Sequence, residues 1–437
     1  MSVDPTMPPS PPSQPATERA TRCCIAGGGP AGMVLGLLLA RAGVDVTVLE
    51  KHNDFLRDFR GDTVHPSTLQ VLHELGLLDA FLQRPHDKVR QLHATVYGRD
   101  MVLADFAGLP PPCDFIALMP QWDFLAFIRD EAVRYPGFHL RMDAEATGLV
   151  QEGGAVVGVA LTRGARAGRP LASELRADLV IAADGRHSTL RAAAGLPLRD
   201  LGSPIDVLWM RIPKAPGDPD TTGGHIEPGR FLVAINRGDY WQCALVIAKG
   251  GIADLQARGI ETFRRAIEEV APYFAGRLEL ALPDWDAVKL LSVRVDRLDT
   301  WWRPGLLCIG DAAHAMSPVG GVGINLAVQD AVATANILAA ALADGRPAAG
   351  ITPLLAEVQA RRMWPAKVTQ AVQVMLHKRL LAPIVGAQPG EVRDARPAPR
   401  KVPWPMRLLD DLPLLRGLPA RAVGLGVRPE HVRSPKR

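Results

Sequence analysis

The chain has 437 residues, of which 47% are hydrophobic and 22% are charged, and this composition is ordinary for a globular protein. Its length suits two domains rather than one compact core. The formal net charge of +4 is too small to predict nucleic-acid binding, and the five cysteines form no CxxC pair. We therefore expect reduced, buried thiols, and neither a disulfide framework nor a metal site.

The first 20 residues are rich in Pro and Ser and lack an apolar core. This composition predicts a disordered tail at 1–20 and differs from that of a signal peptide. No uninterrupted apolar stretch approaches the ~20 residues that are needed to span a bilayer. The sequence therefore predicts a cytoplasmic protein.

A strand–helix–strand unit opens the ordered part of the chain. Apolar residues 23–26 predict a short strand, and the glycine-rich turn after it opens a helix for which Gly43 is the stop signal. Residues 44–49 predict a second buried strand that ends at Glu50. Such a unit places its two strands parallel to each other in one sheet.

The turn of this unit carries a glycine pattern that is typical of dinucleotide binding. Gly27 permits a tight turn, Gly29 lets a pyrophosphate approach the backbone, and Gly32 lets the helix pack close to the strand. The N-terminus of the helix then faces the phosphates. Glu50 follows Gly32 by 18 residues and can accept hydrogen bonds from a ribose diol, although a solvated strand-end carboxylate is the alternative. The pattern does not distinguish NAD from FAD.

Further along the chain, the hydrophobic periodicity predicts a second, more antiparallel sheet and a helical C-terminal part. Helices are expected at 121–135, near 261–270, at 325–342 and at 352–377, the last with a kink at Pro365. Strands are expected as a small meander within 139–180 and as an antiparallel sheet within 201–295. Residues 386–405 are rich in Pro and Arg, which is typical of a linker.

Two later buried strands each deliver an aspartate into a turn. Residues 179–183 end in Asp184 and Gly185, and residues 306–309 run towards Asp311. Glycines after the second strand open a helix, whose free N–H groups and positive dipole suit the negative charge of a reduced flavin. We expect Asp311 to be buried without a local partner, which is costly unless a ligand bonds to it. For Asp184, capping of a turn is the alternative.

In this order and spacing, the three segments resemble the flavoprotein aromatic hydroxylases of the para-hydroxybenzoate hydroxylase type, over roughly residues 21–342. The resemblance implies an α/β fold in which a Rossmann-like FAD-binding domain with a parallel sheet is interleaved with a substrate domain on a mixed or antiparallel sheet. It assigns 21–85, 115–197 and 290–345 to the FAD-binding domain. It assigns 86–114 and 198–289 to the substrate domain, and 346–437 to C-terminal helices with a basic, Pro-rich tail.

The resemblance also implies a set of cofactor-binding residues, which contact the pyrophosphate, the adenosine ribose, the ribityl chain and the flavin ring. They are Gly27, Gly29, Gly32, Glu50, Lys51, Arg60, Gln121, Asp184, Gly185, Asp311, Gly323, Ile324 and Asn325. The family motif places Pro318 near the reactive face of the flavin. A plain surface charge is the alternative role for Arg60, and a helix-start residue without a ligand is the alternative for Gln121.

The chemistry that the resemblance implies is carried by the cofactor. NAD(P)H reduces FAD, O2 adds to the reduced flavin, and the flavin hydroperoxide gives oxygen to an electron-rich ring, so no catalytic residue is assigned. Candidates for substrate contact, for each of which packing or surface exposure is the alternative, are His65, Trp209, Arg211, His225, Tyr240 and Gln242. Few charges lie in the strands of the second sheet, and we therefore expect an apolar aromatic or phenolic substrate.

Other functions remain open on the sequence alone. A flavin-dependent reductase or dehydrogenase of a prenyl-lipid-like substrate would use the same scaffold without inserting oxygen. A flavin-binding redox sensor or assembly partner would have no enzymatic activity. Residues 209–213 resemble part of the W-x-W-x-I-P motif of flavin-dependent halogenases, but Arg211 replaces the second tryptophan of that motif.

The C-terminal tail is basic and amphipathic. Residues 377–437 contain 13 Lys and Arg against 5 Asp and Glu, and residues 404–427 mix Leu, Pro and Arg. Such a tail docks on the protein's own surface, or it helps to capture a greasy substrate or makes weak contact with an anionic membrane. The sequence predicts no particular oligomeric state.

Overall fold

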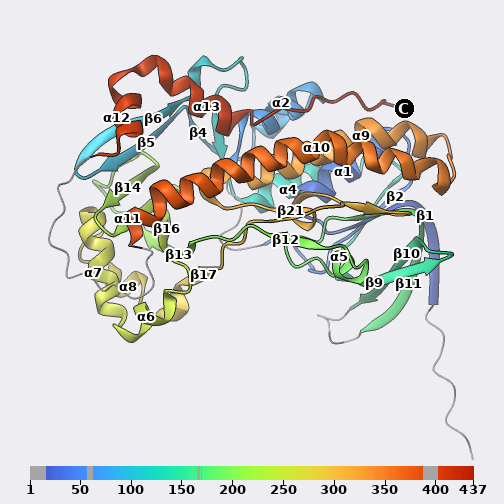
Figure 1. Ribbon diagram of the computed structural model, residues 1–437, viewed down its shortest axis with the longest axis horizontal. Helices are drawn as coiled ribbons and strands as arrows, with labels where there is room; N and C mark the ends of the chain where they lie inside the picture. The colour runs from blue at the N-terminus through green and yellow to red at the C-terminus, as the bar shows by residue number, and fades with distance from the viewer. Residues whose placement is uncertain (1–15, 57–62, 165–167, 169, 387–401) are drawn as a thin grey trace, which may run out of the picture.

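The computed structural model describes residues 16–56, 63–164, 168, 170–386 and 402–437. Two large sheets form the fold, and helices cover them (Figure 1). One sheet has a parallel centre and the other is mainly antiparallel, which confirms the predicted α/β class. All five cysteines are buried, as expected.

The first sheet has the central strand order β19-β20-β11-β1-β2-β8, and β10 and β9 extend it from β11 as antiparallel strands. Its strands are β1 (Ala16–Ala26), β2 (Val46–Leu49), β8 (Phe138–Arg141), β9 (Ala144–Glu152), β10 (Ala155–Arg163), β11 (Leu171–Ala182), β19 (Trp302–Arg303) and β20 (Leu306–Cys308). The strands from β20 to β8 run parallel to one another. Their carboxyl ends therefore lie at one edge of the sheet.

Three helices pack together on one side of this sheet, namely α1 (Pro30–Arg41), α4 (Gln121–Ala132) and α9 (Gly323–Ala343) (Figure 1). The residues of α1 from Ala31 to Ala40 are all buried, because the helix lies between the sheet and its two neighbours. An apolar helix without a polar face is typical of such a position. Within the described residues, one helical stretch, Val319–Ala343, has the length and composition to cross a membrane, and 78% of its most apolar window is buried in the protein.

The second sheet has seven strands in the order β17-β13-β16-β15-β14-β5-β6, which are antiparallel except for the β14–β5 pair. They are β5 (Gln91–Val96), β6 (Arg99–Asp105), β13 (Ile205–Pro213), β14 (Gly223–Glu227), β15 (Arg230–Asn236), β16 (Tyr240–Ala248) and β17 (Lys289–Leu291). Helices α6 (Ile252–Ala257), α7 (Ile260–Val270) and α8 (Leu278–Ala281) cover one face (Figure 1). Apolar side chains of that face form a core of their own with these helices.

Two three-stranded sheets connect these parts. One has the order β12-β18-β21 and the other β3-β7-β4. Their strands are β12 (Leu198–Asp200), β18 (Asp296–Leu298), β21 (His314–Ala315), β3 (Thr63–Val64), β7 (Ile116–Leu118) and β4 (Asp87–Val89). The short helices α2 (Pro66–Glu74), α3 (Leu78–Phe81) and α5 (Thr189–Ala193) lie in the connections.

The longest helix bridges the two large sheets. Helix α10 (Ala348–Leu376) packs on α9, continues through Pro365, and at 1.5 Å per residue is about 43 Å long. A π-helical turn at His377–Leu381 joins it to α11 (Ala382–Val385), which contacts β15 and β16. One long element therefore reaches from the first sheet layer to the second (Figure 1).

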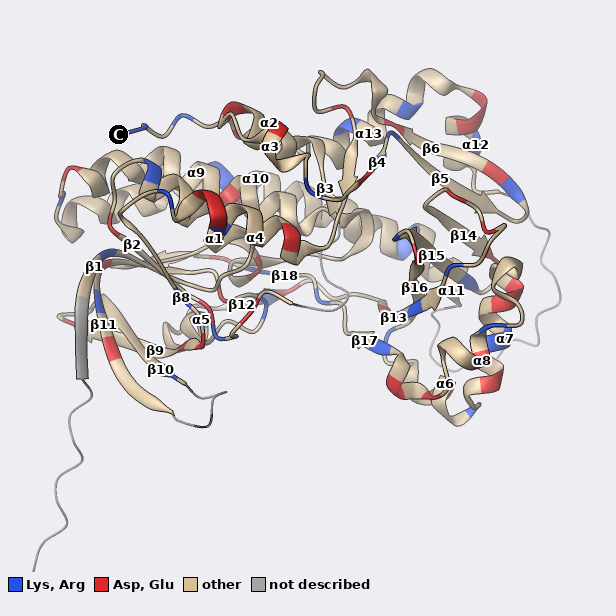
Figure 2. Cartoon of the chain, turned by 180° about the vertical axis from the view of Figure 1, so that it is seen from behind, with Lys and Arg blue, Asp and Glu red and all other residues tan. Residues whose placement is uncertain are grey.

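The C-terminal segment docks on the protein's own surface, which is one of the three roles expected for it. Helices α12 (Trp404–Asp411) and α13 (Gly417–Gly424) pack on β6, and α13 also contacts the 3-10 turn Phe106–Gly108. The chain then runs over α9 and α2 to its end (Figures 1 and 2).

Several predicted boundaries differ from the observed ones by a few residues, two of them near the start of the chain. The expected disordered tail at 1–20 overlaps β1, which begins at Ala16 and pairs there with Ser173 of β11. The second strand begins at Val46 rather than at residue 44. Pairing with a strand that is distant in the sequence extends β1, and local composition gives no sign of that pairing.

Candidate functional site

Four loops meet at the carboxyl edge of the parallel strands. Ala26 at the end of β1 pairs with Leu49 on one side and with Ala182 on the other, and Ala182 pairs with Cys308. The strand ends are therefore in line, and ligands of open α/β sheets bind outside this edge. The predicted residues that follow the strand ends are Gly27, Glu50, Asp184 and Asp311.

The glycine turn after β1 has the geometry that its spacing predicted. Gly27 has a φ of 111°, and a Cβ there would lie 2.2 Å from the carbonyl oxygen of Ala183. A Cβ on Gly32 would lie 2.0 Å from the carbonyl oxygen of Gly27, so helix α1 packs close to the turn. No atom lies within 4 Å of a Cβ built on Gly29, which leaves this backbone open to a ligand. The turn fits a pyrophosphate at the N-terminus of α1.

Glu50 is held at the end of β2 by backbone donors. One carboxylate oxygen accepts a hydrogen bond from the Gly28 amide at 3.0 Å, and the other accepts one from the His52 amide at 3.0 Å. These bonds fix the carboxylate beside the glycine turn, where a ribose diol would lie. Lys51, next in the chain, is exposed at the same strand end.

Asp184 has an unsatisfied oxygen. Its Oδ2 accepts a hydrogen bond from the Leu190 amide at 3.2 Å, and its Oδ1 is buried without a hydrogen-bond partner in the described part of the chain. Burial raises the pKa of Asp184, although hydrogen bonds from Ser188 and Leu190 oppose this shift. A buried, unpaired carboxylate oxygen costs free energy, which is consistent with a site that gains a donor when a ligand binds. Gly185 continues the turn with a φ of 84°.

Asp311 corrects a sequence expectation, because it is neither buried nor without a local partner. Its side chain is 33% exposed, and its Oδ2 lies 3.8 Å from the guanidinium of Arg186. The reason is that the 3-10 turn Gly310–Ala312 projects beyond the end of β20 at the sheet edge. Buried Arg191 donates to the carbonyls of Ala312 and of Arg186 and so ties this turn to the Asp184 turn. Exposure leaves the Asp311 carboxylate accessible to a ribityl chain.

A glycine loop leads into the buried helix α9. Gly320 and Gly321 have φ values of 81° and 64°, and α9 begins at Gly323 without a side-chain cap. The first N–H groups of such a helix remain open to an acceptor. Ile324 and Asn325 are buried behind them, and Asn325 accepts a hydrogen bond from Thr68 Oγ1 at 2.9 Å. The loop fits the partial negative charge of a flavin ring.

Helix α10 supports this loop from behind. Gln373 donates to the carbonyls of Ser317 and Val319 at 3.0 and 3.1 Å and accepts from the Ser317 amide at 3.1 Å. His377 Nε2 shares a 2.7 Å hydrogen bond with the Ser317 hydroxyl. Pro318 lies between the two held residues, and His377 opens the π-helical turn, a feature that is frequent at functional sites.

Two other predicted cofactor residues are less well defined. Gln121 is the first residue of α4 and is partly exposed, which fits either a ligand contact or a plain helix start. Arg60 lies in 57–62, outside the described residues.

The candidate substrate residues of the second sheet lie on two faces. Arg211 pairs with Gln242 across β13 and β16, so these two share with Trp209 and Tyr240 the face opposite α7. Arg211 also lies over the Tyr240 ring, 5.0 Å from its centroid.

His225 is therefore separated from that group, and its proposed substrate contact is corrected. It pairs with Leu232, which belongs to the helix-covered core, and its Nε2 lies 3.0 Å from the Tyr273 hydroxyl. Because side chains alternate along a strand, a single register position puts His225 on the wrong side of the sheet.

His65 is fully buried beside the glycine loop. Its Nδ1 lies 3.0 Å from the carbonyl oxygen of Val423 in α13, and its Nε2 has no partner within the described ranges. Burial lowers the pKa of His65 to about 4, although the bond to Val423 opposes the shift. The ring is therefore neutral at pH 7, with Nδ1–H donating to the carbonyl and a bare Nε2. With 1% of its surface exposed, His65 supports the site and does not line it.

Sequence reasoning missed the residues that support the turns from behind, which are Asp330, Arg362, Gln373 and His377. One signal was available for Asp330, because it is the only charged residue in the apolar sequence of α9. Charged residues are almost never fully buried unless they are paired. No comparable pattern marks Gln373.

The sequence model of the family described as "FAD binding domain" matches residues 20–370 of this chain. The chain is 32% identical over 372 residues to the 6-methylpretetramide 4-monooxygenase of Streptomyces rimosus, which covers 85% of this chain and 87% of the relative. It is 27% identical over 381 residues to a flavin-dependent monooxygenase of Mycobacteroides abscessus, covering 84% of this chain and 76% of the relative.

Solved structures share the fold. An anhydrotetracycline hydroxylase from Streptomyces rimosus superimposes with a TM-score of 0.70 and 22% identity, covering 94% of this chain and 77% of the other. A 2-methyl-3-hydroxypyridine-5-carboxylic acid oxygenase superimposes with a TM-score of 0.65 and 21% identity, covering 84% of this chain and 93% of the other.

Proposed function

The chain belongs to the FAD-binding-domain family, and we propose that it hydroxylates an apolar phenol with fused rings. As an FAD-dependent monooxygenase, it uses NAD(P)H and O2 and hydroxylates an aromatic substrate. The observation that carries the proposal is the meeting of four strand-end loops at one edge, with the glycine loop before α9 facing an apolar part of the second sheet. The reductase alternative is not favoured, since the named relatives are monooxygenases.

The residues at the sheet edge would bind and orient the cofactor. The backbone at Gly27, Gly29 and Gly32 would hold the pyrophosphate, and the fixed carboxylate of Glu50 would accept from the adenosine ribose. Asp311 would accept from the ribityl chain. The bound flavin supplies the redox and oxygen-transfer chemistry, while the chain excludes water and holds the aromatic ring.

Further contacts would complete the cofactor site. Asp184 and Gly185 would close the site beside the pyrophosphate, and Lys51, Arg60 and Gln121 would add contacts along the cofactor. The open N–H groups before Ile324 and Asn325, which begin at Gly323, would stabilise negative charge on the ring.

The second sheet supports an apolar substrate. Val319 of the glycine loop packs against a cluster that contains Ile205 and Val246, on the same face as Trp209. Val207 and Val233 adjoin Trp209 there. We place the substrate on this face, with Arg211, Tyr240 and Gln242 as the polar contacts at its rim and Pro318 near the reacting carbon.

Domain boundaries follow from this assignment. The FAD-binding domain would comprise 21–85, 115–197 and 290–345, and the substrate domain 86–114 and 198–289. Residues 346–437 would form a C-terminal part that packs on both domains.

Isotope labelling tests the proposed reaction. Purified holoenzyme is mixed with NADPH, labelled O2 and a panel of phenols that includes anhydrotetracycline and 1-naphthol. We expect at least one phenol to accelerate NADPH oxidation and to gain one labelled oxygen atom. The methyl ether of that phenol is the matched control, because it keeps the ring system and removes the hydroxyl group.

Other outcomes separate the alternatives. NADPH oxidation with reduced, unlabelled product would indicate a reductase. A yellow protein that oxidises NADPH with none of the phenols would favour a flavin-binding sensor. A colourless protein that stays colourless with added FAD would contradict the whole assignment.

We also propose that the protein is cytoplasmic and that its C-terminal helices make weak contact with an anionic lipid surface. Five apolar side chains of α12, of α13 and of the turn that joins them are at least 41% exposed, namely Trp404, Leu408, Leu412, Leu414 and Leu418. Basic side chains are also exposed at Arg407, three residues after Trp404, and at Arg421, three residues after Leu418. Exposed apolar and basic residues together are typical of interfacial helices.

A further inference from the structure

The chain beyond α13 is tied to helices of the cofactor-binding layer. Asn336 of α9 donates to the carbonyl of His431 and accepts from the Arg433 and Ser434 amides. Glu74 of α2 accepts from the Val432 amide at 2.7 Å and pairs with His431 at 2.5 Å. This segment lies outside the part of the chain that the family sequence model matches.

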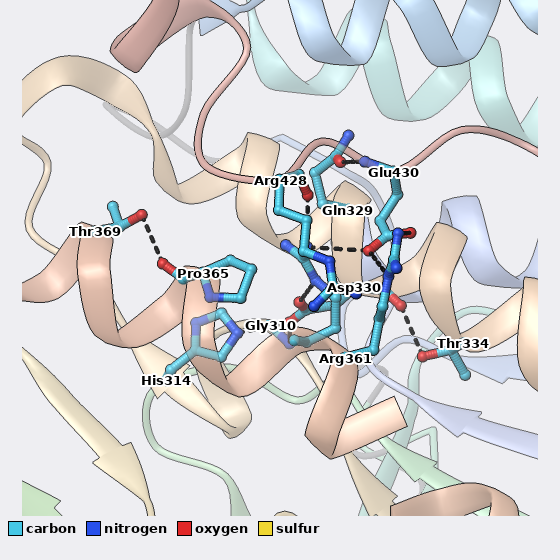
Figure 3. A network of polar contacts seen from close by, with 11 residues as sticks. Gly310, His314, Gln329, Asp330, Thr334, Arg361, Pro365, Thr369, Arg428 and Glu430 are labelled. Carbon is cyan, nitrogen blue, oxygen red and sulfur yellow. Dashed lines mark hydrogen bonds and ion pairs between the residues drawn. The ribbon is translucent and has the colours of Figure 1, made fainter. Parts of the chain in front are cut away.

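Glu430 enters the protein interior at the start of this segment. It is 4% exposed, and Arg361 donates to both of its carboxylate oxygens at 2.7 and 3.0 Å. Arg362 Nη1 lies 3.4 Å from the same carboxylate, and the Glu430 amide donates to Gln329. Glu430 thus places one buried carboxylate within reach of two arginines of α10, and Figure 3 shows it beside Arg361.

Arg362 also binds a carboxylate of α9. Its Nε donates to Asp330 Oδ1 at 2.9 Å, and both residues are almost fully buried. Asp330 Oδ2 accepts from the Gly310 amide at 3.0 Å and from His314 Nε2 at 2.6 Å (Figure 3). Burial alone would raise the pKa of Asp330, but His314 and Arg362 together lower it below its ordinary value, so the group is ionised.

The Gly310 amide is the point at which this network meets the cofactor turn. Gly310 has a φ of 58°, and the next residue is Asp311. A carboxylate that holds the Gly310 amide sets the direction of the Asp311 side chain. Removing one partner from a buried charge network leaves the remaining charge uncompensated. Loss of Glu430 would therefore let Arg362 and Asp330 rearrange, and the turn with them.

We propose that Glu430 is a positioning residue for the cofactor turn, acting through Arg362 and Asp330 on Gly310. This inference rests on the proposed role of Asp311 as a ribityl ligand. Glu430 then supports the FAD site from behind the Gly310–Ala312 turn.

Two glutamate variants of the full-length holoenzyme test the proposal. Glu430→Gln removes the charge that faces Arg362, whereas Glu74→Gln removes an equally direct tether of the same segment that has no path to Asp330. For each we would measure the Kd for FAD by fluorescence titration, the visible circular dichroism of the bound flavin, and the proteolysis rate of the C-terminal segment.

We expect Glu430→Gln to weaken FAD binding about tenfold and to change the dichroism of the flavin. Glu74→Gln should expose residues 431–437 to protease, while Glu430 stays bound to Arg361 and Arg362 and both flavin signals stay unchanged. If Glu430→Gln does not fold, Glu430→Asp keeps the charge with a shorter reach and should show a smaller loss in the same direction.

Equal effects of the two glutamine variants on FAD would overturn the proposal, since tethering alone would then explain them. So would a Glu430→Gln protein with wild-type affinity and dichroism. A wild-type protein that binds no FAD would instead remove the proposed function, and this inference with it.

Discussion

His65 shows how a single buried side chain makes stability depend on pH. The folded protein holds its pKa at about 4, whereas an unfolded histidine titrates near 6.5. Between these values the unfolded chain binds a proton that the folded chain does not. The contribution of His65 to the free energy of unfolding is therefore fully present above pH 6.5, and it is lost as the pH falls towards 4.

We predict that His65→Gln flattens this dependence. Between pH 7 and pH 5, His65 should remove about 2 kcal/mol from the free energy of unfolding of the wild type, and this share should be absent in the variant. Urea unfolding of both proteins at the two pH values measures it. His93→Gln, at an exposed histidine, is the control and should keep the wild-type difference. An unchanged difference in His65→Gln would mean that His65 is already charged in the folded state.

Single residues also show what local sequence can predict. The roles of Gly27 and Gly32 follow from spacing, because the turn and the helix after it are formed by neighbouring residues. The sequence predicts that Asp311 follows a buried strand. The exposure of its side chain, however, depends on how far the next turn projects past the end of that strand. That projection is set by Asp330 and Arg191, which are far from it in the sequence.

At the scale of elements, α10 acts through glutamines on its buried side. Gln359 accepts from the Trp301 amide, Gln370 donates to the carbonyls of Asp296 and Ala315, and Gln373 holds the loop around Pro318. A glutamine amide can both donate and accept, so it satisfies irregular backbone that no strand pairs. The glutamines of α10 thereby form hydrogen bonds with backbone groups that no neighbouring strand pairs.

We predict that Gln373→Leu uncouples the reaction, because it leaves the carbonyls of Ser317 and Val319 unpaired and loosens the loop. The ratio of hydrogen peroxide to hydroxylated product should rise about fivefold, which corresponds to a loss of roughly 1 kcal/mol in loop positioning. Peroxide and product assays measure this ratio. Gln370→Leu is the matched control: it should lower the unfolding free energy similarly while leaving the ratio near that of the wild type.

Elements were easier to predict than their ends. The helix at Gln121–Ala132 and the long C-terminal helix follow from apolar periodicity. The early start of β1 does not, because its partner β11 lies far along the chain. The sequence did not predict which face of the sheet His225 lies on, because strand register depends on the partner strands and not on the strand itself.

At the scale of the whole molecule, hydrophobic periodicity and the family resemblance predicted the two sheet layers, while neither predicted the path of the C-terminal segment. The amphipathic pattern at 404–427 allowed docking or membrane contact, and the contacts of α12 and α13 with β6 support docking of one side. The exposed apolar side chains of α12 and α13 lie on the side that faces away from β6, and this side remains available for membrane contact.

Lipid vesicles test that outer side. We predict that the holoenzyme pellets weakly with anionic phosphatidylserine vesicles at low salt and is released at physiological ionic strength, because basic contacts are screened. Neutral phosphatidylcholine vesicles are the control. Leu414→Ser, at a side chain that is 96% exposed, should reduce pelleting without changing FAD content. The absence of any pelleting at low salt would rule out this contact.

The register of the parallel strands has a consequence for biosynthesis. Cys23 pairs with Leu179, and Val180 pairs with Leu306, so the early glycine turn lacks its neighbours until most of the chain has left the ribosome. Glu430 is translated later still. Nascent chains would thus expose unpaired strand edges for a long interval, which favours chaperone capture and delays coenzyme loading until after release.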